Sequence, residues 1–198
     1  VKASAKMGSK LQKMIDSYNK EKFPETRTQA DAILADSASN EYDKSLAAQL
    51  ASQAAYQTDD TPAAIAYLKQ VIQFNGLDNN GHFQSMLMLG QLQLQEDQYA
   101  EALATFDRFL GETKTSKPEH LVLKGNALYR LERYPEAAQV LKQAIDATLL
   151  PGVVARPLDA RPTTELSVVW HGAMGAAARA FADHVLEAGA EPLPSEAT

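Results

Sequence analysis

The sequence contains no cysteine, which excludes disulfide bonds, thiol catalysis and zinc sites built from cysteine. Aromatic residues make up only 7% of the chain, with a single Trp. The net charge of −6 argues against a surface built for nucleic acid or anionic lipid. No run of 18 apolar residues occurs, so no integral membrane segment is predicted. Hydrophobic residues still make up 45% of the 198 positions, enough to bury a core in one domain or a short array of repeats.

The N-terminal segment 1–6 carries two lysines and no apolar stretch follows it, so no signal peptide is predicted. The chain does not begin with Met, which fits a processed or trimmed product. A secreted origin stays open on this evidence.

An internal repeat is the most informative feature of the sequence. When the segment 86–109 is shifted forward by 35 positions, or back by 38 positions once and then again, apolar and small residues superpose. Periods of this length predict an array of repeated units. One slot of the repeat holds Met14, Ser52, Gly90 and Gly125, and a second slot, expected to face it, holds Ala64, Ala102 and Ala137.

Each unit predicts two helices joined by a short polar turn, because both halves place apolar residues three and four positions apart. Prolines fall in the first turn of the predicted helices. The backbone N–H that proline lacks would have no partner within the helix at this position. The small slot predicts a close approach of the two helices, at which a larger side chain would hold them apart. The segment 75–81, with two Gly and three Asn, predicts a longer loop and a bend between units. The prolines concerned are Pro24, Pro62, Pro118 and Pro135.

The two clearest units carry one residue pattern: Met86, Leu89, Gly90, Tyr99, Ala102 and Phe106, then Leu121, Gly125, Leu128, Tyr134, Ala137 and Leu141. In this pattern the chain resembles the tetratricopeptide repeat (TPR) family over roughly its first 150 residues. The sequence departs from the family at Gln93 and Lys124, which hold usually apolar slots. The resemblance implies an all-α, TPR-like helix-turn-helix solenoid, a right-handed superhelix, with an irregular C-terminal extension.

The predicted array spans residues 1–147, with units at about 7–40, 45–78, 83–117 and 118–151. Residues 148–198 differ in composition, since they lack Lys, Gln, Asn, Tyr and Ile and contain five prolines. They predict a linker followed by one helix that carries Trp170, Met174, Ala178, Phe181 and Val185 on one face. This helix could cap the array. An equally weighted alternative is a frame-shifted or truncated end without evolved function, which would leave an apolar side open to self-association through the C-terminal end.

In the family, the first helix of each pair lines a concave groove that holds a protein or peptide partner. Amides both donate and accept hydrogen bonds, which suits recognition of a peptide backbone, and tyrosines add rigid contact area. A clamp for a C-terminal carboxylate is disfavoured, because the earlier units hold Gln in the slots of Asn126 and Arg130. The alternative is an ordinary solvated helix surface. The implied partner-binding residues are Gln49, Gln53, Tyr56, Gln57, Leu87, Gln91, Leu94, Gln95, Val122, Asn126, Tyr129 and Arg130.

No motif of catalysis is present: the sequence has no P-loop, no Gly-x-Ser-x-Gly and no dinucleotide fingerprint. His82 and His120 fall at predicted helix starts and are expected to be surface residues, and neither they nor His171 and His184 have the spacing of metal ligands. The segments 59–60 and 78–81 predict turns and helix caps, since the Glu that closes a calcium loop is missing. We therefore expect no catalytic residue, no metal and no cofactor.

Lysines share one face of the N-terminal helix, and an apolar face lies beside them. A solvated basic face is the favoured interpretation, and a peripheral membrane contact is the alternative. The apolar face would pack on the next helix of an array. The basic face holds Lys6, Lys10 and Lys13, and the apolar face holds Leu11, Met14, Ile15 and Tyr18.

The sequence thus predicts a non-catalytic scaffold or adaptor that binds a partner segment in its concave groove and does not bind nucleic acid. The alternative is a structural component of an envelope assembly that uses the convex faces and the ends of the array. The acidic, Gln-rich composition and the segment 18–34 resemble proteobacterial cell-envelope TPR proteins. This resemblance implies a periplasmic or envelope-associated location, with the cytoplasm as the alternative.

Overall fold

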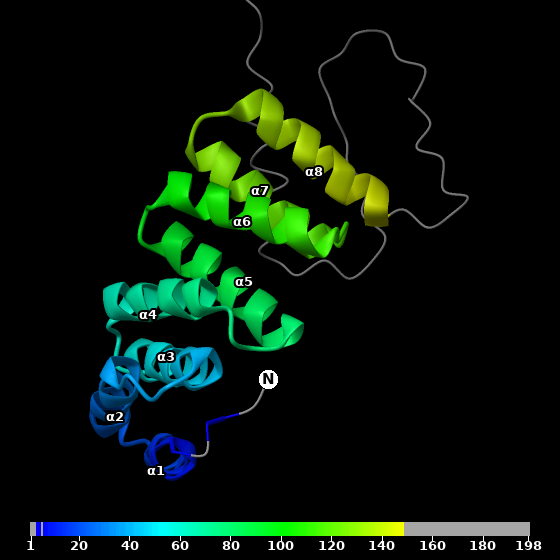
Figure 1. The fold of residues 1–198 in the computed structure, drawn as a ribbon. Coiled ribbons are helices and arrows are strands. Elements are labelled where there is room, and N and C mark those ends of the chain that lie inside the picture. The colour runs from blue at the N-terminus through cyan, green and yellow to red at the C-terminus, as the bar shows by residue number, and fades with distance from the viewer. Residues whose placement is uncertain (1–2, 5, 149–198) are drawn as a thin grey trace, which may run out of the picture. The chain divides into compact units, whose positions relative to one another are not determined.

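The computed structural model describes residues 3–4 and 6–148, which form eight helices and no strand (Figure 1). The helices are α1 (Gly8–Asn19), α2 (Phe23–Ala35), α3 (Glu41–Tyr56), α4 (Thr61–Phe74), α5 (Asn79–Gln95), α6 (Tyr99–Thr113), α7 (Pro118–Arg130) and α8 (Tyr134–Thr148). They form four pairs joined by short turns, and the fold is all-α and TPR-like, as predicted.

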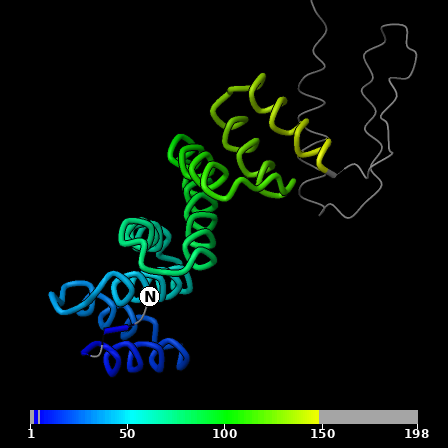
Figure 2. The backbone as a smooth tube through the Cα atoms, turned by 45° about the vertical axis from the view of Figure 1, so that its right-hand side comes forward, coloured from blue at the N-terminus to red at the C-terminus, as the bar shows by residue number. Residues whose placement is uncertain are grey.

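Each helix packs against the next one along the chain, from α1 to α8, as the tube in Figure 2 also shows. The first helices of the pairs are not equally close to each other. Within the described residues, α1 packs on α3, whereas α3 and α5 make no comparable contact, and neither do α5 and α7. The surface between α3 and α5 is therefore available for a cavity.

The turn inside each helix pair has the same backbone geometry. One residue in each turn has a φ between 56° and 59°, in the left-handed region, and these residues are 38, 38 and 35 positions apart, the periods of the sequence repeat. The next N–H in each turn donates to a carbonyl five residues back, as Asp60 does to Ala55. This is the Schellman pattern that ends a helix. The left-handed residues are Glu21, Asp59, Asp97 and Glu132.

Burial follows the repeat register through all four units. The residues that face the small slot are at most 1% exposed in every unit, including Thr26, which replaces Ala in the first unit. Leu11 and Met14 of α1 are likewise buried, and Lys10 and Lys13 are exposed, as the two predicted faces of this helix require. Lys6 is exposed as well, but it lies before the start of α1 at Gly8.

The small residues allow the close approach that their recurrence predicted. A methyl carbon built on Gly90 would lie 2.5 Å from Cε1 of Phe106, and one built on Gly125 would lie 2.7 Å from Cδ2 of Leu141. Both distances are shorter than carbon atoms tolerate. The large side chain of the second helix thus fills the space that the missing side chain leaves.

The loop after the second pair is shorter than we predicted. Helix α5 already begins at Asn79, so the loop spans residues 75–78, and Asp78 accepts a hydrogen bond from the Gly81 N–H (2.8 Å) as an N-cap. A cap this strong starts the helix despite the Gly in its first turn. The loop is tied to α3, because the Gly76 N–H donates to Ser45 Oγ (2.9 Å).

The two residues that depart from the family pattern have polar partners. Lys124 Nζ lies 2.7 Å from Asp107 Oδ1, and its side chain is 27% exposed. Gln93 is buried, and its Oε1 accepts a hydrogen bond from Thr105 Oγ1 (2.7 Å). Satisfied polar groups of this kind can replace apolar residues at modest cost.

The predicted C-terminal helix around Trp170, the alternative of a frame-shifted tail and the self-association through the C-terminal end all fall outside the described residues. They stay predictions, as does the division of the chain at residues 147 and 148.

Candidate partner-binding site

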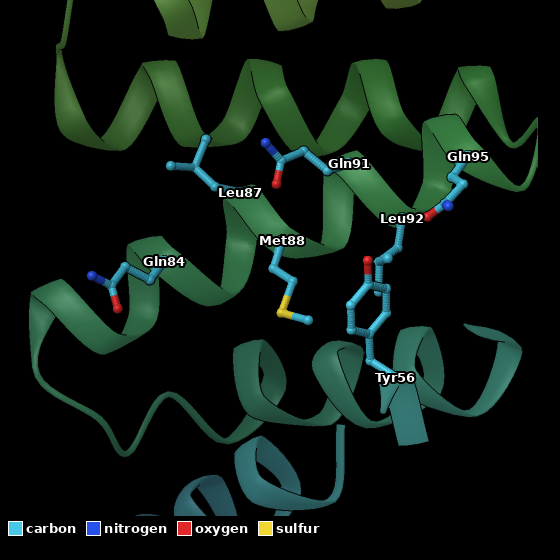
Figure 3. A pocket seen from close by; sticks show the side chains of 7 residues that line it. All are labelled: Tyr56, Gln84, Leu87, Met88, Gln91, Leu92 and Gln95. Carbon is cyan, nitrogen blue, oxygen red and sulfur yellow. The ribbon is translucent and has the colours of Figure 1, made fainter. Parts of the chain in front are cut away.

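An open cavity of about 470 Å³ lies between the end of α3 and one side of α5. Figure 3 shows the Met88 side chain and the Tyr56 ring on the same side of α5, with the ring beside Leu92. Apolar side chains form most of the wall, and glutamine amides lie among them. Its lining residues are Tyr56, Gln84, Leu87, Met88, Gln91, Leu92 and Gln95.

A second cavity of about 390 Å³ lies at the other ends of the same two helices. It is lined by Tyr42, Leu46, Gln49, Leu77, Asp78 and Gly81. The residues of α3 that line the two cavities, together with Gln53 between them, are spaced by three or four positions and so share one helix face. We call this face with both cavities the α3–α5 trough.

The trough contains part of the predicted stripe. Tyr56, Leu87, Gln91 and Gln95 line the first cavity, and Gln49 lines the second. Gln57 is exposed directly after α3. Sequence reasoning missed Gln84, Met88 and Leu92 in the first cavity, and Tyr42, Leu46 and Leu77 in the second. Their spacing is that of an ordinary core face, and Leu92 is indeed only 4% exposed.

The remaining predicted residues line neither of these two cavities. Leu94, Val122 and Tyr129 pack against the apolar cluster of the last two helix pairs, and Asn126 is half-buried on α7. Arg130 lies with its guanidinium 4.7 Å from the centre of the Tyr99 ring and 3.3 Å from Asp97 Oδ1. This arginine is thus already paired with a carboxylate of the preceding unit.

Tyr56 is unusual among the equivalent positions of the repeat. Tyr18 of the first unit stacks edge-on against Phe23 at 5.8 Å, and Tyr129 of the fourth stacks against Tyr134 at 5.5 Å. In the second unit the residue five positions later is Thr61. The Tyr56 ring consequently has no aromatic partner in the described part of the chain, and the residue is 44% exposed at the edge of the trough.

Of the two described histidines that we predicted at the surface, His82 is buried and His120 is half-buried. His82 is 5% exposed, with its Nε2 3.6 Å from Glu112 Oε2, and His120 packs edge-on against Phe109 at 4.9 Å. Burial lowers the pKa of the His120 imidazole below its ordinary value. The helix starts at which they lie are covered by α6, a tertiary contact that local sequence does not reveal.

The carboxylate beside His82 has a partner within its own helix, α6. Arg108 donates to Glu112 (2.6 Å), and this hydrogen bond, more than the neighbouring His82, lowers the pKa of the Glu112 carboxyl.

Across residues 3–4 and 6–148, no three His, Asp or Glu side chains are grouped so that they could hold a metal ion. In the same residues, no helix is both long and apolar enough to cross a lipid bilayer.

Comparison with known proteins supports the repeat assignment. Residues 87–148, which contain most of α5 and all of α6, α7 and α8, match the family model described as "Tetratricopeptide repeat". No curated protein sequence matches the chain.

Solved structures show a similar fold. Two crystal structures of a candidate kinesin light chain of Podosopora anserina, with nearly identical TPR-like repeats, superpose on the chain with a TM-score of 0.53 each. One of them, a point variant, is 15% identical and covers 72% of this chain and 74% of its own length. The other is 16% identical and covers 74% of this chain and 78% of its own. At this identity the similarity supports the fold alone.

Proposed function

We propose that this chain is a non-catalytic scaffold or adaptor that holds a segment of a partner protein in the α3–α5 trough. The observation that carries the proposal is Tyr56, an exposed aromatic side chain with no partner ring among the described residues, which lines a cavity of about 470 Å³ with Met88 and Leu92. TPR proteins bind protein partners, and their fold is typically that of a scaffold.

The chemistry of the cavity supports this role. A tyrosine at the edge of an apolar cavity offers a large contact area at little cost in conformational entropy. Met88 adapts its shape to different side chains, because its unbranched chain has several rotatable bonds. Gln84, Gln91 and Gln95 can donate to and accept from a partner backbone. We expect a micromolar affinity, about −8 kcal/mol, since the apolar area is small.

Site-specific crosslinking in the native cell tests the proposal. A photo-crosslinking residue in place of Gln91 lies in the cavity, and the same residue in place of Gln143 lies on the exposed face of α8 as a matched control. We expect a defined partner to be crosslinked at Gln91 and not at Gln143. Tyr56→Ala should abolish this product, whereas Tyr134→Ala, which removes another exposed tyrosine, should leave it intact.

The alternative function uses the second helices instead. A cavity of about 370 Å³ lies between α4, α5 and α6, with Ile72, Met86 and Leu89 in its wall and Lys69 and Arg108 among its polar residues. A structural component of an envelope assembly could dock there or at the ends of the array. Crosslinks that form equally at Gln143, or that persist in Tyr56→Ala, would favour this alternative. The envelope location itself stays a prediction.

A further inference from the structure

We infer that the α3–α5 trough takes an extended, non-acidic internal segment of its partner, with two apolar anchor residues four or five positions apart. The inference rests on the proposed function and specifies the partner. It follows from the two cavities of the trough, their separation along α3 and the charges around them.

The separation of the cavities sets the spacing of the anchors. Leu46 lines the second cavity and Tyr56 the first, and both belong to α3. Ten helical residues span about 15 Å, at about 1.5 Å per residue. An extended chain covers the same distance in four or five residues, at about 3.3 Å each. A helical ligand would need anchors about ten positions apart, at about 1.5 Å per residue, so the anchor spacing distinguishes the two conformations.

Both cavities offer apolar side chains to an anchor, and the wall of the second also contains the polar residues Gln49 and Asp78. Tyr56, Met88 and Leu92 form one site, and Tyr42, Leu46 and Leu77 form the other. Between them, Gln49 and Gln53 are half-buried on the same face of α3. Their amides lie where the backbone between two anchors would pass, and an extended backbone has free N–H and C=O groups for them.

The charges around the trough disfavour an acidic occupant. Neither cavity is lined by Lys, Arg or His, and the one charged residue in either lining is Asp78. The whole chain has a net charge of −6. Arg130, the cation of the predicted stripe, is paired with Asp97. A C-terminal carboxylate or an acidic segment would therefore enter the trough without a counter-charge, at an electrostatic cost.

Synthetic peptides test the inference with the purified full chain. Each fluorescent peptide carries two leucines separated by one to eleven residues of Ser and Gln, and fluorescence anisotropy measures its Kd. We expect the tightest binding with three or four intervening residues. Tyr42→Ala should weaken this peptide about tenfold, to the affinity of a single-leucine peptide, and Tyr56→Ala should weaken both peptides. Tyr134→Ala is the control and should weaken neither.

A second set of peptides tests the charge argument. Amidation of the C-terminal carboxylate should leave Kd unchanged or improve it. Asp in place of the Ser spacers should weaken binding about fivefold at low salt, and less at high salt because salt screens the repulsion.

The outcomes separate this inference from the proposed function. Binding that depends on Tyr56 but is indifferent to spacing and to Tyr42→Ala would overturn the two-anchor inference and leave the scaffold role intact. An optimum near nine intervening residues would overturn the extended conformation, and tighter binding of acidic peptides would overturn the charge argument. Failure of every peptide would also overturn the inference, while crosslinking at Gln91 decides the scaffold role independently.

Discussion

Tyr56 and Tyr129 occupy the same position of the repeat but have opposite environments. Tyr129 lies against the apolar cluster of the last two helix pairs and stacks on Tyr134. Tyr56 is 44% exposed and lines the larger cavity of the trough. The difference arises from the residue five positions later, which is aromatic in the fourth unit and Thr61 in the second.

The comparison shows how a repeat can separate stability from binding. The backbone frame is common to both units, down to the left-handed turn residues Asp59 and Glu132. The tyrosine contributes to packing where a neighbouring aromatic ring stacks on it. It is available to bind a partner protein where that ring is missing. We expect the following changes to test this contrast, in order of decreasing effect.

Alanine at the two tyrosines should give opposite results. Tyr129→Ala should lower the free energy of unfolding by about 2 kcal/mol, since it removes a half-buried ring from a packed cluster. Tyr56→Ala should lower it by less than about 0.5 kcal/mol, as for an exposed substitution. Urea denaturation of both variants measures the difference. Equal losses would mean that Tyr56 contributes to the core as Tyr129 does.

The helix contacts of the third and fourth units should respond unequally to an added methyl group. Gly90→Ala should cost about 1–3 kcal/mol, because Phe106 is 1% exposed and cannot move away. Gly125→Ala should cost less, because Leu141 is half-buried and more mobile in its rotamers.

Gly111 of α6 provides the control for these two variants, since nothing lies within 4 Å of an added carbon there. Gly111→Ala should stabilise the chain by up to about 1 kcal/mol through helix propensity. Thermal unfolding measures all three variants. An unchanged melting temperature for Gly90→Ala would contradict the close helix contact.

Thr61→Phe should give the second unit the aromatic pair that the fourth unit has. The new ring would lie where Phe23 and Tyr134 lie in their units and would stack on Tyr56. We expect partner binding to weaken roughly threefold to tenfold, about 1 kcal/mol, while stability rises slightly. Fluorescence anisotropy with the two-leucine peptide measures the change in binding, and urea denaturation measures the change in stability. Unchanged binding would show that Tyr56 does not need to be free, and Thr61→Val serves as the control without a ring.

Acid should affect the packed region and not the trough. Burial lowers the pKa of His120, so below about pH 6.5 the unfolded chain takes up a proton that the folded chain does not. The contribution of this group to stability is present above that pH and decreases as the pH falls through it. His120→Phe should therefore lose less stability than the wild type between pH 7.5 and 5.5 in urea denaturation. Equal losses of stability in the variant and the wild type would mean that another group causes the acid sensitivity.

Much of the fold could be predicted from the sequence because repeat and burial share one period. Gly90 and Gly125 identified the helix contacts, and Pro118 the start of α7. The loop after α4 was predicted too long, because the N-cap Asp78 starts α5 before the glycine that we took as part of the loop.

The candidate site was less predictable. The sequence placed Tyr56 and Gln91 on one predicted face, and both line the same cavity. It also placed Arg130 on that face, whereas this side chain pairs with Asp97 from the preceding unit. His82 is buried under α6 although its local sequence suggested a helix start at the surface.

The sequence by itself determined the helix pairs, their register and the close contacts within them, since these depend on residues a few turns apart with a fixed period. Only the tertiary structure decided which members of the predicted stripe are free. That depends on how far apart the first helices of successive units lie, a distance set by side chains from four different helices. Because α3 and α5 do not pack on each other as α1 and α3 do, a cavity lies beside Tyr56.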